Sequence, residues 1–331
     1  MLKVYAKPRL AAPAYLWVQS AGMALFAVNK PLGRTSHDVV DMARKLLGTR
    51  RVGHTGTLDP LATGVLILAT EASTKLVPFL SAEEKEYIAW VSFGVTTATL
   101  DAEGPVMGPD TGHPSQREIE AALPWFLQLT EQTPPAYSAV KVGGVKAYEA
   151  ARRGQALELT PRPVVYREVS LLAYDPAPTP HRIAPSATGW QLAPRGRPVE
   201  LPRPLGDYPT AVIRLVVGPG TYVRSFARDL GQRLGTQAFL SGLVRTRVGR
   251  IGLEQAQEIE RLDVHRTLDE LEALSCPSVE LTHAEAKRVM EGVPLAIPAK
   301  GLVALVGPKR RLVAIAEGDG FKLRIKRVFK T

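Results

Sequence analysis

The chain has 331 residues, more than one ordinary domain, and 45% of them are hydrophobic, which excludes a wholly disordered protein. Its net charge of +10 favours a polyanionic partner such as RNA, DNA or an anionic membrane surface, with a merely basic enzyme as the alternative. The single cysteine, Cys276, excludes an internal disulfide or a thiolate metal cluster and favours a cytoplasmic location.

The N-terminal segment has two interpretations. Residues 10–29 are uncharged and follow three basic residues, as in a signal peptide or a membrane span. However, polar residues and a proline interrupt this run, and its second half, MALFAV, predicts a strand. We therefore expect residues 1–23 to be a disordered extension, with Met23 as an alternative start.

The next elements predicted are a helix, a loop and a strand. An amphipathic helix should follow Ser36 as its N-cap and end at Gly48. The sequence GHTGTLDPLATG then places Asp59 on a glycine-rich loop that leads into an apolar strand at 65–69.

Further along the chain, alternation predicts strands at 87–93 and 211–217, the second followed by a helix containing GTYVRSFARDLG. Residues 133–154 predict a mobile loop and a short helix, and the proline-rich stretch 176–209 predicts an inserted, partly disordered loop. A helix is expected in the 254–274 region. The composition changes after Pro277, which predicts a boundary followed by a helix and short basic strands.

Several reaction classes lack their usual motifs. The sequence contains no P-loop, no G-x-S-x-G elbow and no G-x-G-x-x-G fingerprint. It therefore offers no usual motif for phosphoryl transfer, serine hydrolysis or hydride transfer, respectively. Its six histidines do not have metal-ligand spacing. Asp59 remains as a lone carboxylate, which is a competent nucleophile if a nearby cation keeps it ionised. The alternative is a structural aspartate in an Asp-Pro turn.

Five motifs, in order and spacing, resemble the bacterial tRNA pseudouridine synthase family of the TruB type. They are NKPLGRTS at 29–36, GHTGTLDPLATGVL at 53–66, the Tyr87 strand with GVTTATLDAEG, PPAYSAVK at 134–141 and GTYVRSFARDLG at 220–231. The resemblance covers about residues 24–275. The segment 277–331 is more weakly similar to a PUA-type RNA-binding domain.

The resemblance implies a catalytic role for three residues. Asp59 matches the nucleophile that lets uracil leave through N1 and rejoin its ribose through C5. Tyr87 matches the tyrosine that stacks on the flipped uracil, and Arg224 matches the arginine that pairs with the catalytic carboxylate. Attack at uracil C6 and attack at ribose C1′ both stay open.

The same resemblance implies binding and supporting roles. His54 matches a histidine that enters the tRNA T-loop, Tyr222 a tyrosine beside the base, and Leu243 a leucine that lines the pocket. Lys30 and Pro31 match a motif that supports the active-site loop. Each of these residues could instead be ordinary core or loop structure.

The fold implied is α+β, with a mixed, mainly antiparallel sheet flanked by helices in a catalytic domain at 24–275 and a small β-rich domain at 277–331. The implied reaction is isomerisation of uridine 55 without a metal, nucleotide or flavin cofactor. The expected partner is the tRNA T-arm, with no membrane, no obligate protein partner and a monomeric state. Arg228, Arg245 and Arg247 are further candidates for phosphate contacts.

Two features depart from the family pattern: Ala98 replaces an aspartate in the turn after Tyr87, and the 176–209 insertion is long. Three alternatives to a stand-alone synthase stay open. They are a guide-RNA-dependent relative, a non-catalytic tRNA-folding chaperone and a basic metabolic enzyme.

Overall fold

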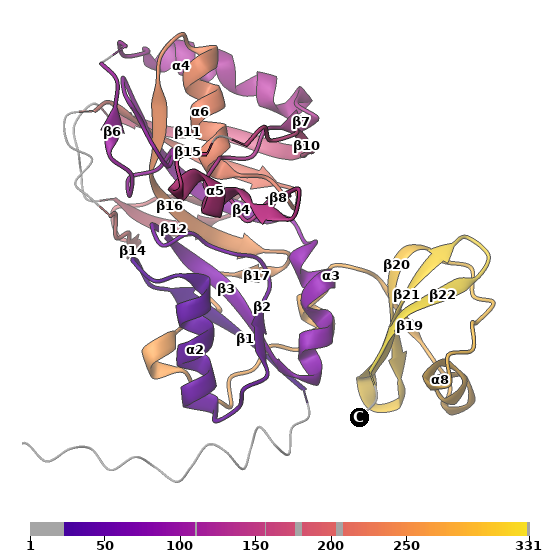
Figure 1. Cartoon of the computed structure of the whole chain (residues 1–331). Helices are drawn as coiled ribbons and strands as arrows, with labels where there is room; N and C mark the ends of the chain where they lie inside the picture. Colours follow the sequence, from indigo (N-terminus) through magenta and orange to yellow (C-terminus); the bar gives the residue numbers. More distant parts are fainter. Residues whose placement is uncertain (1–22, 110, 156, 176–180, 203–207, 330–331) are drawn as a thin grey trace, which may run out of the picture.

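The computed structural model describes residues 23–109, 111–155, 157–175, 181–202 and 208–329 (Figure 1). The expectation of a disordered N-terminal extension therefore lies outside the described residues, except that Met23 already belongs to the first strand. The strands of the main sheet are β1 (Met23–Lys30), β2 (Val52–His54), β3 (Ala62–Glu71), β4 (Lys85–Phe93), β11 (Tyr166–Asp175), β15 (Thr210–Val217), β16 (Ala238–Val248), β17 (Ile251–Gly252) and β18 (Gln257–Glu258).

The main sheet is mixed and mainly antiparallel, as predicted. Its order is β11-β15-β4-β16-β3-β1-β18, with β17 beside β16 and β2 beside β3. The β16/β3 and β1/β18 pairs are parallel, whereas the others are antiparallel.

The two faces of this sheet bury different side chains. Along β4, Tyr87, Ala89 and Val91 pack on one face, which we call the front face. Ile88 and Trp90 pack on the opposite, rear face, as the two-residue period of a strand requires. Both faces are buried, so β4 lies in the middle of the protein.

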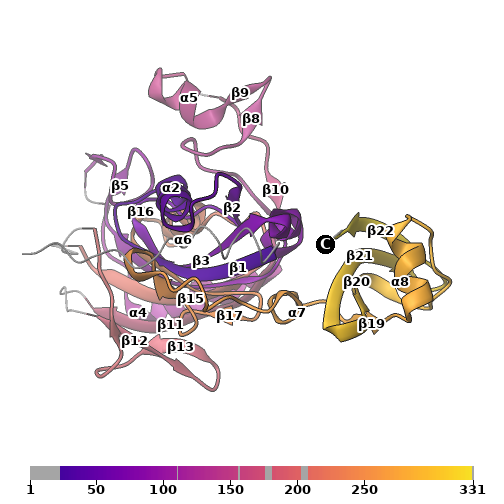
Figure 2. The same cartoon turned by 90° about the horizontal axis from the view of Figure 1, so that it is seen from below.

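The front face is covered by the helices α2 (Ser36–Leu47), α4 (Gln116–Ala122), η2 (Leu123–Gln128), α6 (Val223–Arg233) and η3 (Ile259–Arg261). Those that contribute to the rear-face core are η1 (Ala72–Leu76), α3 (Val77–Ser81) and α7 (Glu270–Ala273). Figure 2 shows α2 and α6 on one side of the sheet and the strands of the 176–209 segment on the other.

Short paired strands complete the part of the chain that precedes the insertion. They are β5 (Thr96–Thr97) with β6 (Val106–Met107), β7 (Glu131–Gln132) with β10 (Arg162–Pro163), and β8 (Lys141–Val142) with β9 (Val145–Lys146). Helix α5 (Ala147–Arg152) follows β9, which confirms the short helix predicted there. Figure 2 shows α5 and the β8–β9 hairpin projecting from the body on the front side.

The 176–209 segment differs from its prediction as a loop. Residues 176–180 and 203–207 lie outside the described residues, but those between them form a three-stranded sheet of β12 (Arg182–Ser186), β13 (Gly189–Leu192) and β14 (Arg197–Pro198). We call it the insertion sheet. Its Ile183 and Trp190 are buried in the rear-face core. This tertiary packing stabilises strands in a segment for which the prolines predicted an irregular loop.

The helix expected across 254–274 is also wrong. Gln257 pairs with Val28 at the edge of the main sheet, and its side chain bonds to the backbone of Asp263 and Arg266. Parallel pairing with β1 thus overrides the local helix propensity. Only the short η3 and α7 are helical in this region.

Helix α2 is confirmed, but its N-cap is Thr35 and not Ser36. The Thr35 hydroxyl accepts from the Asp38 amide at 3.0 Å, and the Asp38 carboxylate accepts from the Thr35 amide at 2.8 Å. This is a capping box. It leaves the buried Ser36 hydroxyl available for another contact, described below.

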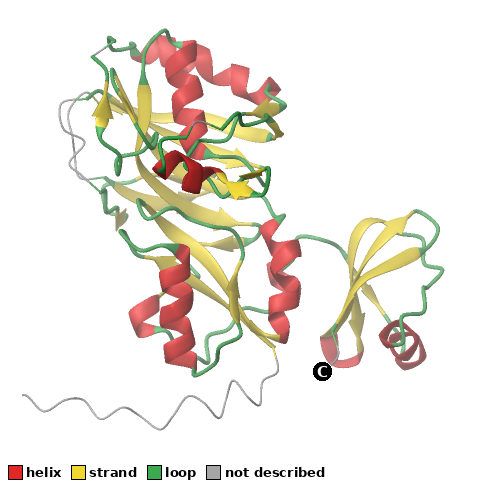
Figure 3. Cartoon of the chain, in the orientation of Figure 1, coloured by secondary structure: helices red, strands yellow, loops and turns green. Residues whose placement is uncertain are grey.

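The C-terminal part is a small β-rich unit, as predicted, seen at the side of Figure 1 and, with its strands in yellow, in Figure 3. It comprises β19 (Ser278–Glu280), α8 (His283–Met290), β20 (Lys300–Gly307), η4 (Pro308–Arg310), β21 (Arg311–Asp319) and β22 (Leu323–Val328). The unpredicted strand β19 pairs in parallel with β20. Within the described residues, no helix is long and apolar enough to cross a membrane.

Gly64 is a point of close approach between the strands that carry the site. It pairs with Arg245 across the parallel β3/β16 contact and has a φ of +106°. A Cβ at this position would overlap the backbone of Arg245, so only glycine fits.

Gly64→Ala should therefore lower the free energy of unfolding by about 2–4 kcal/mol, since it combines strain with a backbone clash. Gly33→Ala is the matched control, because Gly33 also has a positive φ (+76°) but open space around it; its cost should be about 1 kcal/mol. Urea denaturation of both variants measures the difference. Equal losses would contradict the packing argument.

Candidate active site around Asp59

The loop at 55–61 joins β2 to β3, and residues 33–36, which lead from β1 into α2, hold it in place. The buried Ser36 hydroxyl accepts from the Leu58 amide at 2.8 Å and donates to the Leu58 carbonyl at 3.1 Å. On the other side of Asp59, the Gly33 amide donates to the Pro60 carbonyl at 2.8 Å. Both neighbours of Asp59 are therefore held by the backbone or by a side chain of 33–36.

Arg245, on the neighbouring strand β16, also holds this loop in place. Its Nε donates to the Val65 carbonyl at 2.7 Å, its Nη2 donates to the Gly56 carbonyl at 3.1 Å, and the residue is 1% exposed. The prediction that Arg245 contacts phosphate is wrong, because its guanidinium is buried and binds carbonyls. Arg228 and Arg247 pair with Asp229 and Glu84 within the chain.

The Asp59 carboxylate forms an ion pair with Arg224. Arg224 Nε lies 2.9 Å from Asp59 Oδ2, and the side chains are 7% and 35% exposed respectively. The cation is thus buried while the carboxylate stays accessible. Arg224 stands in the first turn of α6, where the helix dipole disfavours a cation, so the carboxylate compensates for its position.

Three further contacts hold Arg224 in place. Its Nη1 donates to the Thr99 carbonyl at 3.2 Å, and its Nη2 donates to the Tyr137 carbonyl at 3.0 Å. Asp101 Oδ2 lies 3.6 Å from Arg224 Nε. One guanidinium therefore joins α6, the Asp59 loop, the turn after β4 and the loop that contains Tyr137.

Asp101 is a member of the site that the sequence did not single out. Its carboxylate accepts from the Thr99 hydroxyl at 2.5 Å and from the Glu103 amide at 3.0 Å. Burial raises the pKa of Asp101, while Thr99 and Arg224 oppose that rise. The preceding Leu100 has a φ of +63°, a strained conformation that the turn imposes.

Two of the predicted binding residues, Tyr87 and Leu243, lie in the front-face core, and Tyr222 lies at the start of α6. Tyr87 and Leu243 are 8% and 6% exposed and belong to the same core cluster as Leu58, which precedes Asp59. Tyr222 is the N-cap residue of α6, two residues before Arg224, and burial raises its pKa. Tyr87 comes from β4, Leu243 from β16 and Tyr222 from the start of α6, and the Asp59 charge acts on the Tyr222 hydroxyl.

His54 ends β2, at the entrance to the Asp59 loop. Burial lowers its pKa, and the positive charge of Arg245 lowers it further. The imidazole is therefore neutral near pH 7 and presents a small planar surface.

Lys30 contacts the Asp59 loop at Pro60. It is fully buried, and its Nζ donates to the Pro31 carbonyl at 2.9 Å and the Pro60 carbonyl at 3.4 Å. Burial lowers the pKa of Lys30 from 10.5 to about 8, while the Asp59 carboxylate opposes that fall.

The described residues contain no group of three or more His, Cys, Asp or Glu side chains that could hold a metal ion. The chemistry that these residues allow is that of an accessible carboxylate paired with a buried guanidinium, which is a competent nucleophile.

Comparison with known proteins agrees with this geometry. Residues 44–187 match the model of the N-terminal domain of the TruB family of pseudouridylate synthases. A Thermus thermophilus protein named tRNA pseudouridine synthase B is 68% identical over 308 residues, which cover 93% of this chain and 99% of that protein. The chain belongs to the TruB family.

More distant relatives share the name or the fold. A Deinococcus radiodurans tRNA pseudouridine synthase B is 45% identical and covers 93% of this chain and 100% of its own length. Among solved structures, a chain in a Cbf5–Nop10–Gar1 complex superposes with a TM-score of 0.67 at 22% identity, over 98% of this chain and 91% of that one. This similarity confirms the fold of the TruB-type chain.

The Lys30 environment predicts a specific pH dependence of stability. Its pKa is about 8 in the native protein and 10.5 when unfolded, so between these values the unfolded chain binds more protons. The contribution of residue 30 to stability therefore rises with pH across this window. Relative to Lys30→Met, the wild-type unfolding free energy should rise by up to about 1.4 kcal/mol per pH unit.

Urea denaturation of both proteins at several pH values from 8 to 10.5 measures the two slopes. Because the comparison uses slopes, the hydrogen bonds lost in the variant do not affect it. Parallel curves would show that Lys30 keeps its ordinary pKa in the native state.

Proposed function

We propose that this protein converts uridine 55 of the tRNA T-loop to pseudouridine, with Asp59 as the nucleophile. The observation that carries the proposal is the accessible Asp59 carboxylate, 2.9 Å from the buried Arg224. The name shared by the Thermus and Deinococcus relatives supports the same reaction.

The reaction is an isomerisation and needs no redox partner. The N1–C1′ bond of uridine breaks, the uracil rotates, and a C5–C1′ bond forms. C5 then loses its hydrogen and N1 gains one, so the atoms balance. A carboxylate nucleophile divides this change into two easier steps: Asp59 bonds covalently to the nucleoside in the first step and is released as the carboxylate beside Arg224 in the second.

The pocket residues would hold the reacting base. A uridine stacked in its loop cannot reach Asp59, so it must be extruded at a cost of a few kcal/mol. Stacking on Tyr87 would offset about 1–3 kcal/mol of this cost. Tyr222 and Leu243 would close the sides of the pocket, and His54 would occupy the space that the uridine leaves in the T-loop.

The charge distribution fits a tRNA partner. Nine lysines and arginines lie between Lys300 and Lys330 against two acidic residues, in the segment that we propose is a PUA-like RNA-binding domain at 277–331. We propose a catalytic domain at 24–275, a cytoplasmic monomer, and activity on tRNA alone without a guide RNA or an obligate protein partner.

Asp59→Ala should abolish product, with a rate loss of at least about 10⁴-fold, because it removes the nucleophile. Affinity for tRNA should stay within a few-fold, since phosphate contacts dominate it. Asp41→Ala is the matched control, because Asp41 pairs with Arg44 on the surface of α2. Pseudouridine mapping of an unmodified tRNA transcript, with no guide added, measures product.

Turnover by the Asp59→Ala variant within tenfold of wild type would contradict the assignment. Wild-type product that requires a guide RNA would instead identify the guide-dependent relative. A tRNA-folding activity without any product would identify a chaperone.

A further inference from the structure

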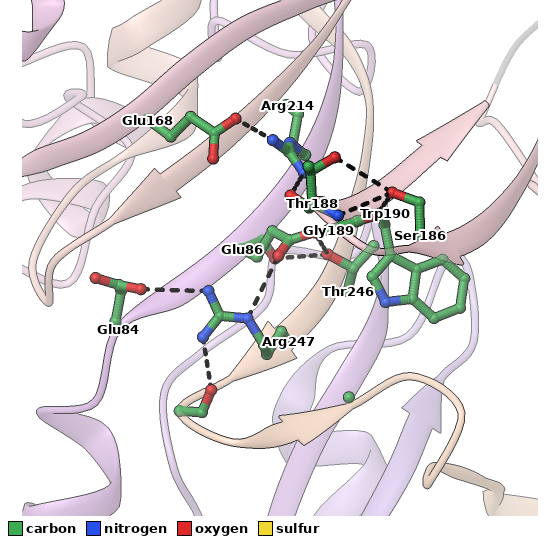
Figure 4. A network of polar contacts seen from close by, with 12 residues as sticks. Glu84, Glu86, Glu168, Ser186, Thr188, Gly189, Trp190, Arg214, Thr246 and Arg247 are labelled. Atoms are coloured by element: carbon green, nitrogen blue, oxygen red, sulfur yellow. Dashed lines mark hydrogen bonds and ion pairs between the residues drawn. The ribbon is translucent and has the colours of Figure 1, made fainter. Parts of the chain in front are cut away.

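A partly buried polar network joins the main sheet to the insertion sheet (Figure 4). At its centre is Glu86, the residue before Tyr87 on β4, which is 3% exposed. Because successive side chains of a strand point to opposite faces, Glu86 lies on the rear face of the sheet while Tyr87 lies on the front face.

The Glu86 carboxylate joins the insertion sheet to two strands that carry the site. Its Oε1 accepts from the Trp190 amide of β13 at 2.8 Å and from the Thr246 hydroxyl of β16 at 3.2 Å. Its Oε2 accepts from Arg247 Nε at 3.3 Å. A single carboxylate thus binds β4, β13 and β16 together.

The Thr246 contact falls at an irregularity that matters for the front face. The β4/β16 register shifts between Arg245 and Arg247, where Glu86 pairs with Arg247 and Tyr87 with Arg245. Thr246 is the extra residue of this bulge. By binding Thr246 and Arg247, Glu86 holds the bulge that directly follows Arg245 in β16.

Arg214 of β15 attaches the insertion sheet at a second point. It bonds to the Thr188 carbonyl in the β12–β13 turn and to Glu168 of β11, as Figure 4 shows. The next residue, Gly189, has a φ of +118°, and a Cβ there would overlap Arg214 and approach Glu86 at 3.2 Å. The turn is therefore built around these two charged side chains.

A third attachment runs from the other edge of the insertion sheet to β3, the strand that follows the Asp59 loop. Arg197 of β14 pairs with Glu258, which accepts from Asn29 Nδ2 at 3.1 Å. Asn29 Oδ1 in turn accepts from the Gly64 amide at 3.1 Å. The insertion sheet is thus connected by polar contacts to both strands that flank Arg245.

Buried charged contacts of this kind contribute little net stability compared with apolar packing, but they can specify a single arrangement. A slip of β4 by one residue would exchange Glu86 with Tyr87. Apolar packing of the insertion sheet alone would cover the rear face without opposing such a slip.

We propose that Glu86 is a positioning residue, and that the insertion sheet holds Tyr87 and Arg245 in their active-site positions through it. The proposal rests on the proposed function, because the positions matter for extrusion and attack at uridine 55. It gives the insertion a role on the rear of the sheet, away from the RNA.

Two variants test this role. Glu86→Gln keeps the size of the side chain but places an amide donor opposite Arg247, and Gly189→Ala displaces the insertion sheet without changing Glu86. Both should lower the single-turnover rate at saturating enzyme by about tenfold or more, since small displacements of reacting groups cost this much. Their tRNA dissociation constants should stay within twofold of wild type.

Two control variants should keep the wild-type rate. Glu84→Gln removes the more exposed partner of Arg247, which lies 3.2 Å from it. Arg182→Gln removes a side chain that bonds to the Gly196 carbonyl within the insertion.

Amide hydrogen exchange at 85–88 and 244–248 adds a readout that does not require activity. It should be faster in Glu86→Gln and Gly189→Ala than in the two controls.

Weaker tRNA binding with an unchanged single-turnover rate would overturn the proposal and assign the insertion to RNA contact. A lower melting temperature with an unchanged rate and unchanged exchange at these strands would also overturn it, in favour of a purely stabilising role. Absence of product with the wild-type protein would refute the proposed function instead, and the exchange data would still test the coupling.

Discussion

The ion pair between Asp59 and Arg224 is the interaction on which the site depends. A carboxylate beside apolar side chains stays charged only if a cation or several donors stabilise it. Arg224 can do so because Thr99 and Tyr137 accept its remaining donors and Asp101 adds a second negative charge. Four segments far apart in the chain must therefore fold correctly before this ion pair forms.

The rest of the fold makes this convergence rigid. Ser36, Gly33 and Lys30 hold the backbone on both sides of Asp59, while Arg245 supports the loop from within the sheet. The front face carries the groups that would react. The rear face makes charged contacts with the insertion sheet through Glu86. The two faces of β4 therefore contact different parts of the protein.

The sequence predicted what short segments determine. The motif around Asp59 indicated the loop, and the alternation at 87–93 indicated β4. It did not predict Asp101, because the contact with Arg224 spans more than 120 residues and depends on a strained Leu100. The sequence also did not predict the insertion sheet, because its prolines indicated a loop. Pro185 of β12 pairs with Trp190 of β13 on one side only, because β14 contacts β12 no further than Ile183. At such a sheet edge the N–H that proline lacks costs little.

The central claim is tested most directly by the single-turnover rate of pseudouridine formation in Arg224→Gln at saturating enzyme. Arg233→Gln, at the exposed end of the same helix, is the control. The account predicts a rate at least about 100-fold below wild type for Arg224→Gln, as expected for loss of a preorganised charge, with tRNA affinity within a few-fold. A rate within twofold of wild type would contradict it.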